Sequence, residues 1–195
     1  MILFLNGSPR LQSVSTAILR TIQAEAEKTS TVEWLDVSNL RVQPCTGCEG
    51  CRPNGECVLP EDDGHRVGKL LGSCSALVVG TPTYWGNMSG PLKALFDRNV
   101  TAIEHCDKGM IPTPLHRGKK AILVTACNAP FPFSMMLSHG RGAIRSLRTI
   151  VKAGGFNVLK TITISSASRF EKTSVKWTSR AKAIGRKLGA VNSRS

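Results

Sequence analysis

The stretch Ile2-Leu3-Phe4-Leu5-Asn6-Gly7-Ser8-Pro9-Arg10 decides the fold of this chain. Four apolar residues in a row that end at an Asn-Gly-Ser-Pro turn predict a short strand buried on both faces. The apolar residues of 15–28 recur with a period near 3.6 and predict a helix that packs on this strand. A buried strand, a polar turn and a covering helix form the opening unit of a parallel α/β sheet.

The same alternation continues along the chain. Further buried strands are predicted at 32–37, 76–79, 121–124 and 158–164, and helices at 62–71, 89–104, 142–153 and 174–188. Because helices connect consecutive strands by right-handed crossovers, we expect a five-stranded parallel sheet with helices on both faces. Ligands bind such sheets beyond the carboxyl ends of the strands, so the loops after the first, third and fourth strands are the candidate sites. The Ser89 hydroxyl is expected to cap the helix that begins near Pro91.

One domain is expected. The chain has 195 residues, of which 41% are apolar, and this suits a single domain, 1–195, with a core of its own. Residues 39–61 are rich in Cys, Gly and Pro without a regular period, which predicts an insertion loop. No apolar run reaches the roughly 18 residues of a membrane helix, and the opening run is too short for a signal peptide. We therefore expect a cytoplasmic protein that makes no membrane contact.

Positive charge is concentrated in the C-terminal part of the chain. The net charge is +13; residues 1–118 hold 11 basic and 12 acidic residues, whereas 119–195 hold 15 basic residues and only Glu171 as an acid. Such a field attracts an acidic redox protein, an anionic cofactor or a nucleic acid, although a solvated basic face explains it equally well. Nucleic acid is the least favoured partner, because aromatic residues make up only 5% and no binding module accompanies the charge.

The loop after the first strand has the composition of a phosphate site. It carries several hydroxyl side chains and leads into a helix N-terminus, whose amides and dipole attract an anion, and Arg10 adds a charge. The loop has neither the Gly-x-Gly-x-x-Gly pattern nor the lysine of a Walker loop, which argues against a dinucleotide fold and a nucleotide hydrolase. An ordinary turn before a capped helix explains the same residues without a ligand.

The loop after the third strand reads Thr81-Pro82-Thr83-Tyr84-Trp85-Gly86-Asn87-Met88-Ser89-Gly90-Pro91-Leu92-Lys93. Its aromatic faces and backbone amides suit a flat heteroaromatic ring with polar edges; packing of Tyr84 and Trp85 on the next helix is the alternative. Gly-Ser-Pro-Arg after the first strand, together with this loop, resembles the flavodoxin-like NAD(P)H-dependent FMN reductase family. The four clustered cysteines before Asp62-Asp63 resemble the iron–sulfur flavoprotein branch of that family.

The resemblance implies a flavodoxin-like three-layer α/β sandwich whose five-stranded parallel sheet has the order 2-1-3-4-5. It implies that the FMN phosphate is held by Ser8, Arg10, Ser15 and Thr16. It also implies that the isoalloxazine edge lies on Pro82, Thr83, Tyr84, Trp85, Gly86 and Asn87. Residues 125–130 would face the far side of the flavin. NAD(P)H is implied as a possible substrate, and no side chain is identified as a catalytic acid or base.

Four of the seven cysteines lie within thirteen positions: Cys45, Cys48, Cys51 and Cys57. In a chain with no expected secretory leader, such clustering favours a metal over disulfides. Three cysteines at successive x2 spacing suit one [4Fe–4S] cluster, and a turn at Asn54-Gly55 can fold Cys57 back to complete it. Structural zinc, which more often uses two separated Cys-x2-Cys pairs, and a metal-free loop remain open.

The remaining cysteines and histidines carry no metal-binding spacing. We expect structural roles for Cys74, Cys106 and Cys127, surface or packing roles for His65, His105, His116 and His139, and helix-capping roles for Asp62 and Asp63.

Three functions are compatible with these observations. The first is a redox flavoprotein that binds FMN and a [4Fe–4S] cluster, acts as a homodimer or homotetramer, and docks an acidic partner such as ferredoxin through its basic part. The second is a cluster-free NAD(P)H-dependent FMN or quinone reductase. The third is a non-catalytic α/β module that binds zinc or nucleic acid.

Overall fold

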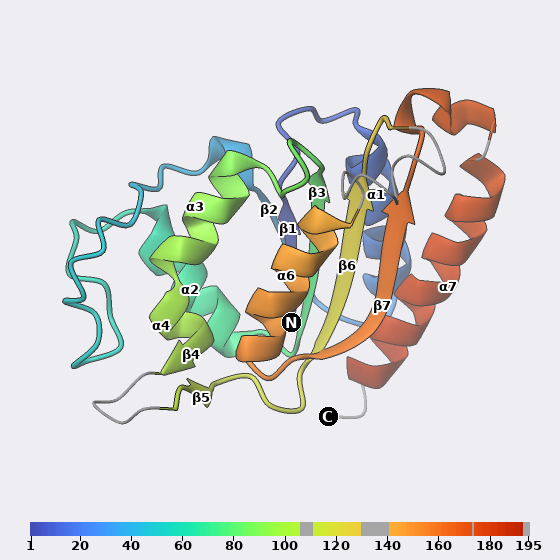
Figure 1. The fold of residues 1–195 in the computed structure, drawn as a ribbon. Coiled ribbons are helices and arrows are strands. Elements are labelled where there is room, and N and C mark those ends of the chain that lie inside the picture. The colour runs from blue at the N-terminus through green and yellow to red at the C-terminus, as the bar shows by residue number, and fades with distance from the viewer. Residues whose placement is uncertain (106–110, 130–140, 173, 193–195) are drawn as a thin grey trace.

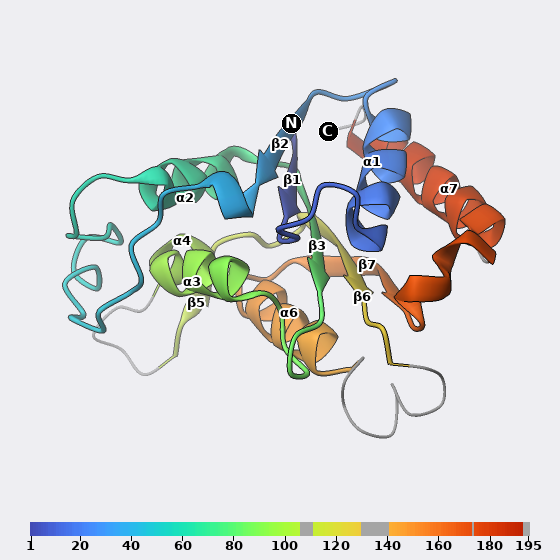
Figure 2. The same ribbon diagram turned by 90° about the horizontal axis from the view of Figure 1, so that it is seen from above.

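The computed structural model is a three-layer α/β sandwich, and it describes residues 1–105, 111–129, 141–172 and 174–192. Figures 1 and 2 show the parallel sheet between two layers of helices. The sheet strands are β1 (Ile2–Asn6), β2 (Val32–Asp36), β3 (Ala76–Pro82), β6 (Lys120–Ala126) and β7 (Asn157–Ile164). The longer helices are α1 (Val14–Ala26), α2 (Asp63–Ser73), α3 (Gly90–Arg98), α6 (Gly142–Ala153) and α7 (Ser174–Asn192). Short helices are η1 (Val37–Asn39), α4 (Val100–Ile103) and η2 (Ala167–Lys172).

The sheet has the order β2-β1-β3-β6-β7, and every pairing in it is parallel. Numbered by the five sheet strands alone, this is the expected order 2-1-3-4-5. The difference from the prediction is a second, two-stranded antiparallel sheet of β4 (Glu104–His105) and β5 (Thr113–Pro114), which no sequence pattern indicated. Two residues per strand are too few to show a period of two.

Each face of the sheet has its own apolar core. Side chains alternate across a strand, so Leu3 and Leu5 of β1 lie in the cluster with α2, α3 and α6, while Ile2 and Phe4 lie in the cluster with α1 and α7. All four side chains are fully buried. Figure 2 shows the same division, with α1 and α7 on one side of the sheet and α2, α3 and α6 on the other. The four-residue apolar run therefore belongs to a strand covered on both faces, as the sequence predicts.

The helix expected at 89–104 is broken. It ends at Arg98, Asn99 has φ −111° and ψ 25°, and α4 continues from Val100. The Ser89 hydroxyl was expected to cap this helix, and that prediction is wrong. The hydroxyl instead donates to the Gly7 carbonyl at 2.6 Å, because the β1 and β3 loops lie side by side. Ser89 thus ties together the two loops that carry the flavodoxin-like motifs.

Asp62 and Cys74 have the structural roles that the sequence predicts. Asp62 is the N-cap residue of α2, as expected, and Cys74 is buried against the core. Cys106, Pro130 and His139 lie outside the described residues. Among the described residues, no helix is both long and apolar enough to cross a membrane.

His116 is a buried polar residue at the amino end of the sheet, far along the chain from any motif. Its Nε2 lies 2.7 Å from the Ala102 carbonyl, its Nδ1 lies 3.2 Å from Lys119 Nζ, and its ring stacks on Phe156 at 4.5 Å. The Nε2–H therefore donates to the carbonyl and Nδ1 accepts from the ammonium, which requires a neutral ring. Burial, and secondarily the Lys119 charge, hold the pKa of His116 below its usual value.

We expect the free energy of unfolding to decrease as the pH falls below about 6.5, the ordinary pKa of histidine. Below this pH His116 binds a proton in the unfolded chain, whereas in the folded chain it stays neutral until the pH reaches its lowered pKa. Urea unfolding at pH 7.5 and pH 5.5 measures the loss, and a His116→Gln variant is the control, since an amide keeps polar partners without titrating. An equal loss in both proteins would assign the pH dependence to other groups.

Candidate active site at the carboxyl edge of the sheet

The loop between β1 and α1 is held by a chain of hydroxyl groups. Ser13 is the N-cap residue, and its Oγ accepts a hydrogen bond from the Thr16 amide at 3.2 Å. The same Oγ lies 3.1 Å from Ser15 Oγ and 2.8 Å from Thr16 Oγ1. The Thr16 hydroxyl donates to Asn6 Oδ1 at 3.1 Å. Because these three hydroxyl side chains are buried, the loop is ordered before any ligand arrives.

Donors at the start of α1 remain available. The first bond of the helix is Ala17 N to Ser13 O, so the amides of Val14 and Ser15 precede it, and neither has an acceptor within the described part of the chain. The Arg10 side chain is exposed beside them and likewise has no partner within that part. Free amides, a helix dipole and a guanidinium at one place are the features that bind a phosphate group.

The loop after β3 forms a tight turn. Tyr84 and Asn87 exchange two backbone hydrogen bonds of 2.9 Å, and the two residues between them, Trp85 and Gly86, have φ of 51° and 77°. A positive φ is strained for tryptophan, which the turn holds with its side chain 99% exposed. Packing of Trp85 on the next helix, the alternative considered from sequence, is therefore wrong. Tyr84 is 46% exposed and lies at the edge of a cavity.

This cavity, of about 250 Å³, lies where the loops after β1, β3, β6 and β7 meet. In Figure 1 these loops lie together at the upper edge of the sheet. Its lining residues are Arg10, Gln12, Ser13, Val14, Ser15, Pro82, Thr83, Tyr84, Ala126, Cys127, Asn128, Ala167 and Ser168. The site was expected at this edge, but the contribution of η2 after β7 was not. The position of Ala167 just beyond a strand end was the one signal available.

The predicted site residues divide into three groups. Arg10, Ser15, Pro82, Thr83 and Tyr84 line the cavity. Ser8 and Thr16 are buried behind it, where the Ser8 hydroxyl donates to Arg10 O at 3.1 Å and shapes the turn. Trp85, Gly86 and Asn87 form the turn at its rim. Of the residues missed from sequence, Ser13 and Gln12 come from the same loop as Arg10.

Two buried hydroxyl groups near the strand ends have no partner. Thr83 Oγ1 and Thr125 Oγ1 are inaccessible to solvent and make no hydrogen bond to any of the described residues. A buried hydroxyl without a partner costs about 1–3 kcal/mol, so such groups often serve a ligand. Together with the free amides at α1, the residues present fit a cofactor that carries a phosphate at one end and a polar-edged ring at the other.

The cysteine loop is the segment 40–62 between η1 and α2, and it projects on the far side of α2, α3 and α4 from the cavity (Figure 1). Cys45 and Cys48 are exposed, Cys51 and Cys57 are half-buried, and all four thiols are free. Hydrogen bonds from the Gly50 backbone and Thr46, with the charge of Arg98, hold the pKa of the Cys48 thiol below its usual value. The donor set has the chemistry of a metal–thiolate site. The described residues nevertheless include no three ligands gathered around one point.

Comparison with known proteins agrees with this geometry. The model of the NADPH-dependent FMN reductase family matches residues 1–170. An iron–sulfur flavoprotein of Methanocaldococcus jannaschii is 31% identical over 96 residues, which are 49% of this chain and 49% of that protein. An iron–sulfur flavoprotein of Clostridioides difficile is 27% identical over 185 residues, which are 91% of this chain and 77% of that protein. The chain thus aligns with about half the length of several curated relatives that it matches.

A solved structure has the same fold. An FMN-dependent NADH-azoreductase from Bacillus anthracis, determined in complex with FMN, superposes with a TM-score of 0.75 at 13% identity, covering 96% of this chain and 98% of that one. At this identity the likeness concerns the fold alone. The family match spans all four loops that border the cavity and all five strands of the parallel sheet. The chain belongs to the NADPH-dependent FMN reductase family.

Proposed function

We propose that this chain is an FMN-dependent oxidoreductase that takes electrons from NAD(P)H or a reduced protein and passes them to an acceptor. The observation that carries the proposal is the cavity at the carboxyl edge of the sheet, where Arg10, the Val14 and Ser15 amides and the Thr83 hydroxyl, which have no partner within the described residues, lie beside Tyr84. FMN, when bound, accepts or donates one or two electrons. The polypeptide supplies binding, orientation and access.

Each part of the cavity has a role in this proposal. The Val14 and Ser15 amides and Arg10 bind the phosphate, while the buried Ser13–Thr16 network holds them in place. At about 250 Å³ the cavity is below the roughly 300 Å³ typical of the smallest ligand pockets, so it cannot enclose a whole cofactor. The isoalloxazine ring would then lie at the rim, against 82–84 and the turn 85–87, with one face open to a substrate.

We further propose that Cys45, Cys48, Cys51 and Cys57 bind a [4Fe–4S] cluster. Support comes from their spacing and from relatives that are named iron–sulfur flavoproteins. The loop must close for the four thiols to meet. Because it projects away from the flavin edge, a homodimer or homotetramer would bring one chain's loop near another chain's flavin. A cluster-free NAD(P)H-dependent FMN or quinone reductase is the second candidate, favoured by the separation of the thiols.

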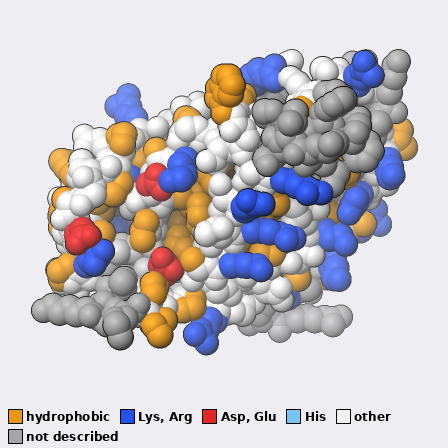
Figure 3. All heavy atoms as spheres, viewed as in Figure 1, with side chains coloured by type: hydrophobic (Ala, Val, Ile, Leu, Met, Phe, Trp, Pro, Cys, Tyr) orange, Lys and Arg blue, Asp and Glu red, His pale blue; other side chains and the backbone are white. Residues whose placement is uncertain are grey.

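A basic surface offers a docking place for an acidic protein such as ferredoxin. Figure 3 shows Lys and Arg side chains gathered over α6, β7 and α7, with few acidic ones among them. The exposed members are Arg145, Arg148, Lys152, Lys160, Lys176, Arg180, Lys182, Arg186 and Lys187. A one-signed surface accelerates encounter with a partner of opposite charge, and salt weakens this effect.

The first experiment is anaerobic purification followed by measurement of FMN, iron, acid-labile sulfide and zinc per chain. About one FMN with about four iron and four sulfide supports the complete proposal. If the protein contains FMN but no iron, even after anaerobic reconstitution, the cluster is excluded and the cluster-free reductase is the supported function. Absence of FMN under both conditions overturns the function. Oxidation of NADPH and NADH by the FMN-loaded protein, with a quinone as acceptor, then tests the proposed donor.

Substitution of Arg10 by glutamine is expected to weaken FMN binding about tenfold or more, because a charge-assisted bond to the phosphate contributes about 1.5–3 kcal/mol. Riboflavin has no phosphate, so its affinity should stay unchanged. Quenching of flavin fluorescence during titration measures both. Arg20→Gln is the matched control, since Arg20 stacks on Trp34 at 3.5 Å on another face of α1. An equal loss for riboflavin and FMN would contradict the phosphate role.

A further inference from the structure

The two ends of the cysteine loop are fastened together by the start of α2. The Gln43 amide donates to Asp62 Oδ2 at 2.9 Å, and the Arg41 amide donates to Asp63 Oδ2 at 2.8 Å. The Asp63 amide donates in return to the Arg41 carbonyl at 3.2 Å. Residues 41–43 therefore lie beside residues 62–63, and the segment with all four cysteines forms a closed loop between them.

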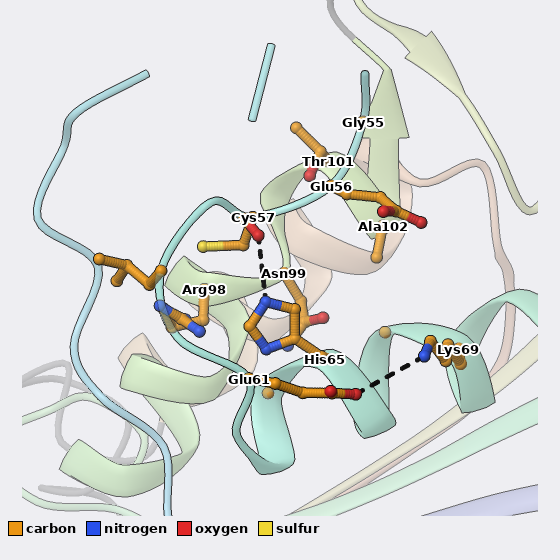
Figure 4. A pocket seen from close by; sticks show the side chains of 13 residues that line it. Gly55, Glu56, Cys57, Glu61, His65, Lys69, Arg98, Asn99, Thr101 and Ala102 are labelled. Carbon is orange, nitrogen blue, oxygen red and sulfur yellow. Dashed lines mark hydrogen bonds and ion pairs between the residues drawn. The ribbon is translucent and has the colours of Figure 1, made fainter. Parts of the chain in front are cut away.

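His65 fixes the last cysteine of this loop. Its Nδ1 accepts a hydrogen bond from the Asp62 amide at 3.1 Å, so the proton is on Nε2, which donates to the Cys57 carbonyl at 3.1 Å. Figure 4 shows this bond from the His65 ring to Cys57. The sequence had assigned His65 only to the surface or to packing. In the structure it positions Cys57 relative to the capping residue of α2.

Arg98 lies beneath the same loop with donors to spare. Its side chain is 1% exposed, and its Nη2 donates to Asp62 Oδ1 at 3.0 Å. Hydrogen bonds from the Gln43 and Gly64 amides and the charge of Arg98 outweigh burial and hold the pKa of Asp62 below its usual value. Nε and Nη1 of Arg98, however, are buried and have no hydrogen-bond partner among the residues that the structure describes. Buried charged donors are rarely left unpaired, so these N–H groups point to an anionic acceptor that is bound in the working protein.

The acceptor belongs to a cavity that the cysteine loop forms with α2, α3 and α4. It measures about 510 Å³, and Cys57, His65 and Arg98 are among its lining residues. In Figure 4 the Cys57 thiol and the Arg98 guanidinium project to the same side of this cavity. A small free anion is disfavoured, because Glu56 and Glu61 also line it. The remaining anionic candidates are the thiolate sulfurs of the cysteine loop, of which Cys57 lines the same cavity as Arg98.

We propose that Arg98 is the positioning and charge-balancing residue of the cysteine loop. Through Nη2 it holds Asp62, which fastens the loop; through Nε–H and Nη1–H it donates to thiolate sulfur once the loop carries its metal. The proposal rests on metal binding by Cys45, Cys48, Cys51 and Cys57. Hydrogen bonds to the sulfurs and buried positive charge are among the factors that raise the reduction potential of an iron–sulfur centre.

The test compares Arg98→Lys and Arg98→Gln with wild type after anaerobic reconstitution. Iron loss to a chelator should be about tenfold faster or more in Arg98→Gln, as for removal of other groups that support metal ligands. The midpoint potential of the cluster should become more negative in Arg98→Gln, and Arg98→Lys should restore it in part. FMN content, which depends on the cavity at the carboxyl edge of the sheet on the other side of these helices, should not change. Arg52→Gln is the matched control: it removes the same charge from the cysteine loop itself, where Arg52 pairs with Glu49 on the surface at 2.8 Å, whereas Arg98 belongs to α3.

The outcomes separate the two proposals. If wild type takes up iron and Arg98→Gln matches Arg52→Gln in both rate and potential, the role of Arg98 is overturned and the proposed function stands. If wild type binds FMN but no metal, the proposed cluster and the proposed role of Arg98 are both overturned. The proposal of an FMN-dependent reductase then stands. A measurement on the folded Arg52→Gln chain avoids reliance on Arg98 variants: with ¹⁵N-arginine, pulsed EPR of the reduced cluster should detect a guanidinium nitrogen, and its absence would overturn the proposal.

Discussion

Replacement of Gly142 by alanine is expected to destabilise the chain by about 2–3 kcal/mol and to weaken FMN binding about tenfold. Gly142 is the first residue of α6, and a Cβ added to it would lie 1.8 Å from the Gly86 carbonyl oxygen. The Gly86 oxygen belongs to the backbone, and the position of a Cβ is fixed by the backbone of its own residue, so neither atom can rotate away. The turn that carries Tyr84 and Trp85 must shift, and with it the rim of the flavin cavity.

The sign of this effect is the informative part. Alanine normally stabilises a helix by about 1 kcal/mol relative to glycine, so propensity alone predicts the opposite result. Gly72→Ala is the matched control, because Gly72 lies within α2 and an added Cβ would meet nothing within 4 Å. Urea unfolding gives the stability of both variants, and flavin titration gives the affinity. Stabilisation by Gly142→Ala comparable to that of Gly72→Ala would show that Gly86 does not rest against α6.

Replacement of Cys48 by serine is expected to reduce iron and sulfide from about four per chain to background, with FMN unchanged at about one. A serine side chain has nearly the same shape as a cysteine side chain, but its hydroxyl does not ionise near neutral pH. The pKa of the Cys48 thiol, in contrast, is lowered by hydrogen bonds from the Gly50 backbone and Thr46, which favours the thiolate. Metal analysis and the visible spectrum of the anaerobically reconstituted protein measure the change. The flavin cavity lies on another side of the molecule, so flavin occupancy serves as an internal reference.

Cys74→Ser is the control for this experiment. Cys74 is buried outside the loop and its thiol donates to the Leu71 carbonyl at 3.3 Å, a bond that a hydroxyl can keep. We expect normal iron content in that variant. Retention of full iron by Cys48→Ser would remove Cys48 from the ligand set, and loss of FMN together with iron would indicate general unfolding instead.

Prediction from sequence was strongest where local pattern and burial agree. The run Ile2–Leu5 could be assigned to a doubly covered strand because nothing polar interrupts it, and the match of residues 1–170 to the family confirms the flavodoxin-like assignment. The end of a helix was less predictable. No local signal marks the break at Asn99, whose side chain amide bonds back to the Leu95 carbonyl at 2.9 Å.

Sites were predicted in part. The loops of Arg10 and Tyr84 follow strand ends, so their convergence follows from parallel topology. Ala167 and Ser168 line the cavity because of the path that the chain takes after β7, and no sequence motif predicts this path. The pairing of Arg98 with Asp62 joins residues 36 positions apart, and no sequence pattern marks Arg98 as the partner of this helix-capping residue.

The sequence by itself determined the class of fold, two of the four loops that border the cavity and the four cysteines of the loop. These features depend on period, composition and spacing, which are properties of neighbouring residues, whereas the order of the sheet came from the resemblance to the reductase family. Tertiary structure alone decided which donors find no partner within the described part of the chain: the Val14 and Ser15 amides, the Thr83 hydroxyl, and Nε and Nη1 of Arg98. The physical reason is that a polar group's partner is set by what packs around it, and distant segments of chain supply that surrounding only after folding.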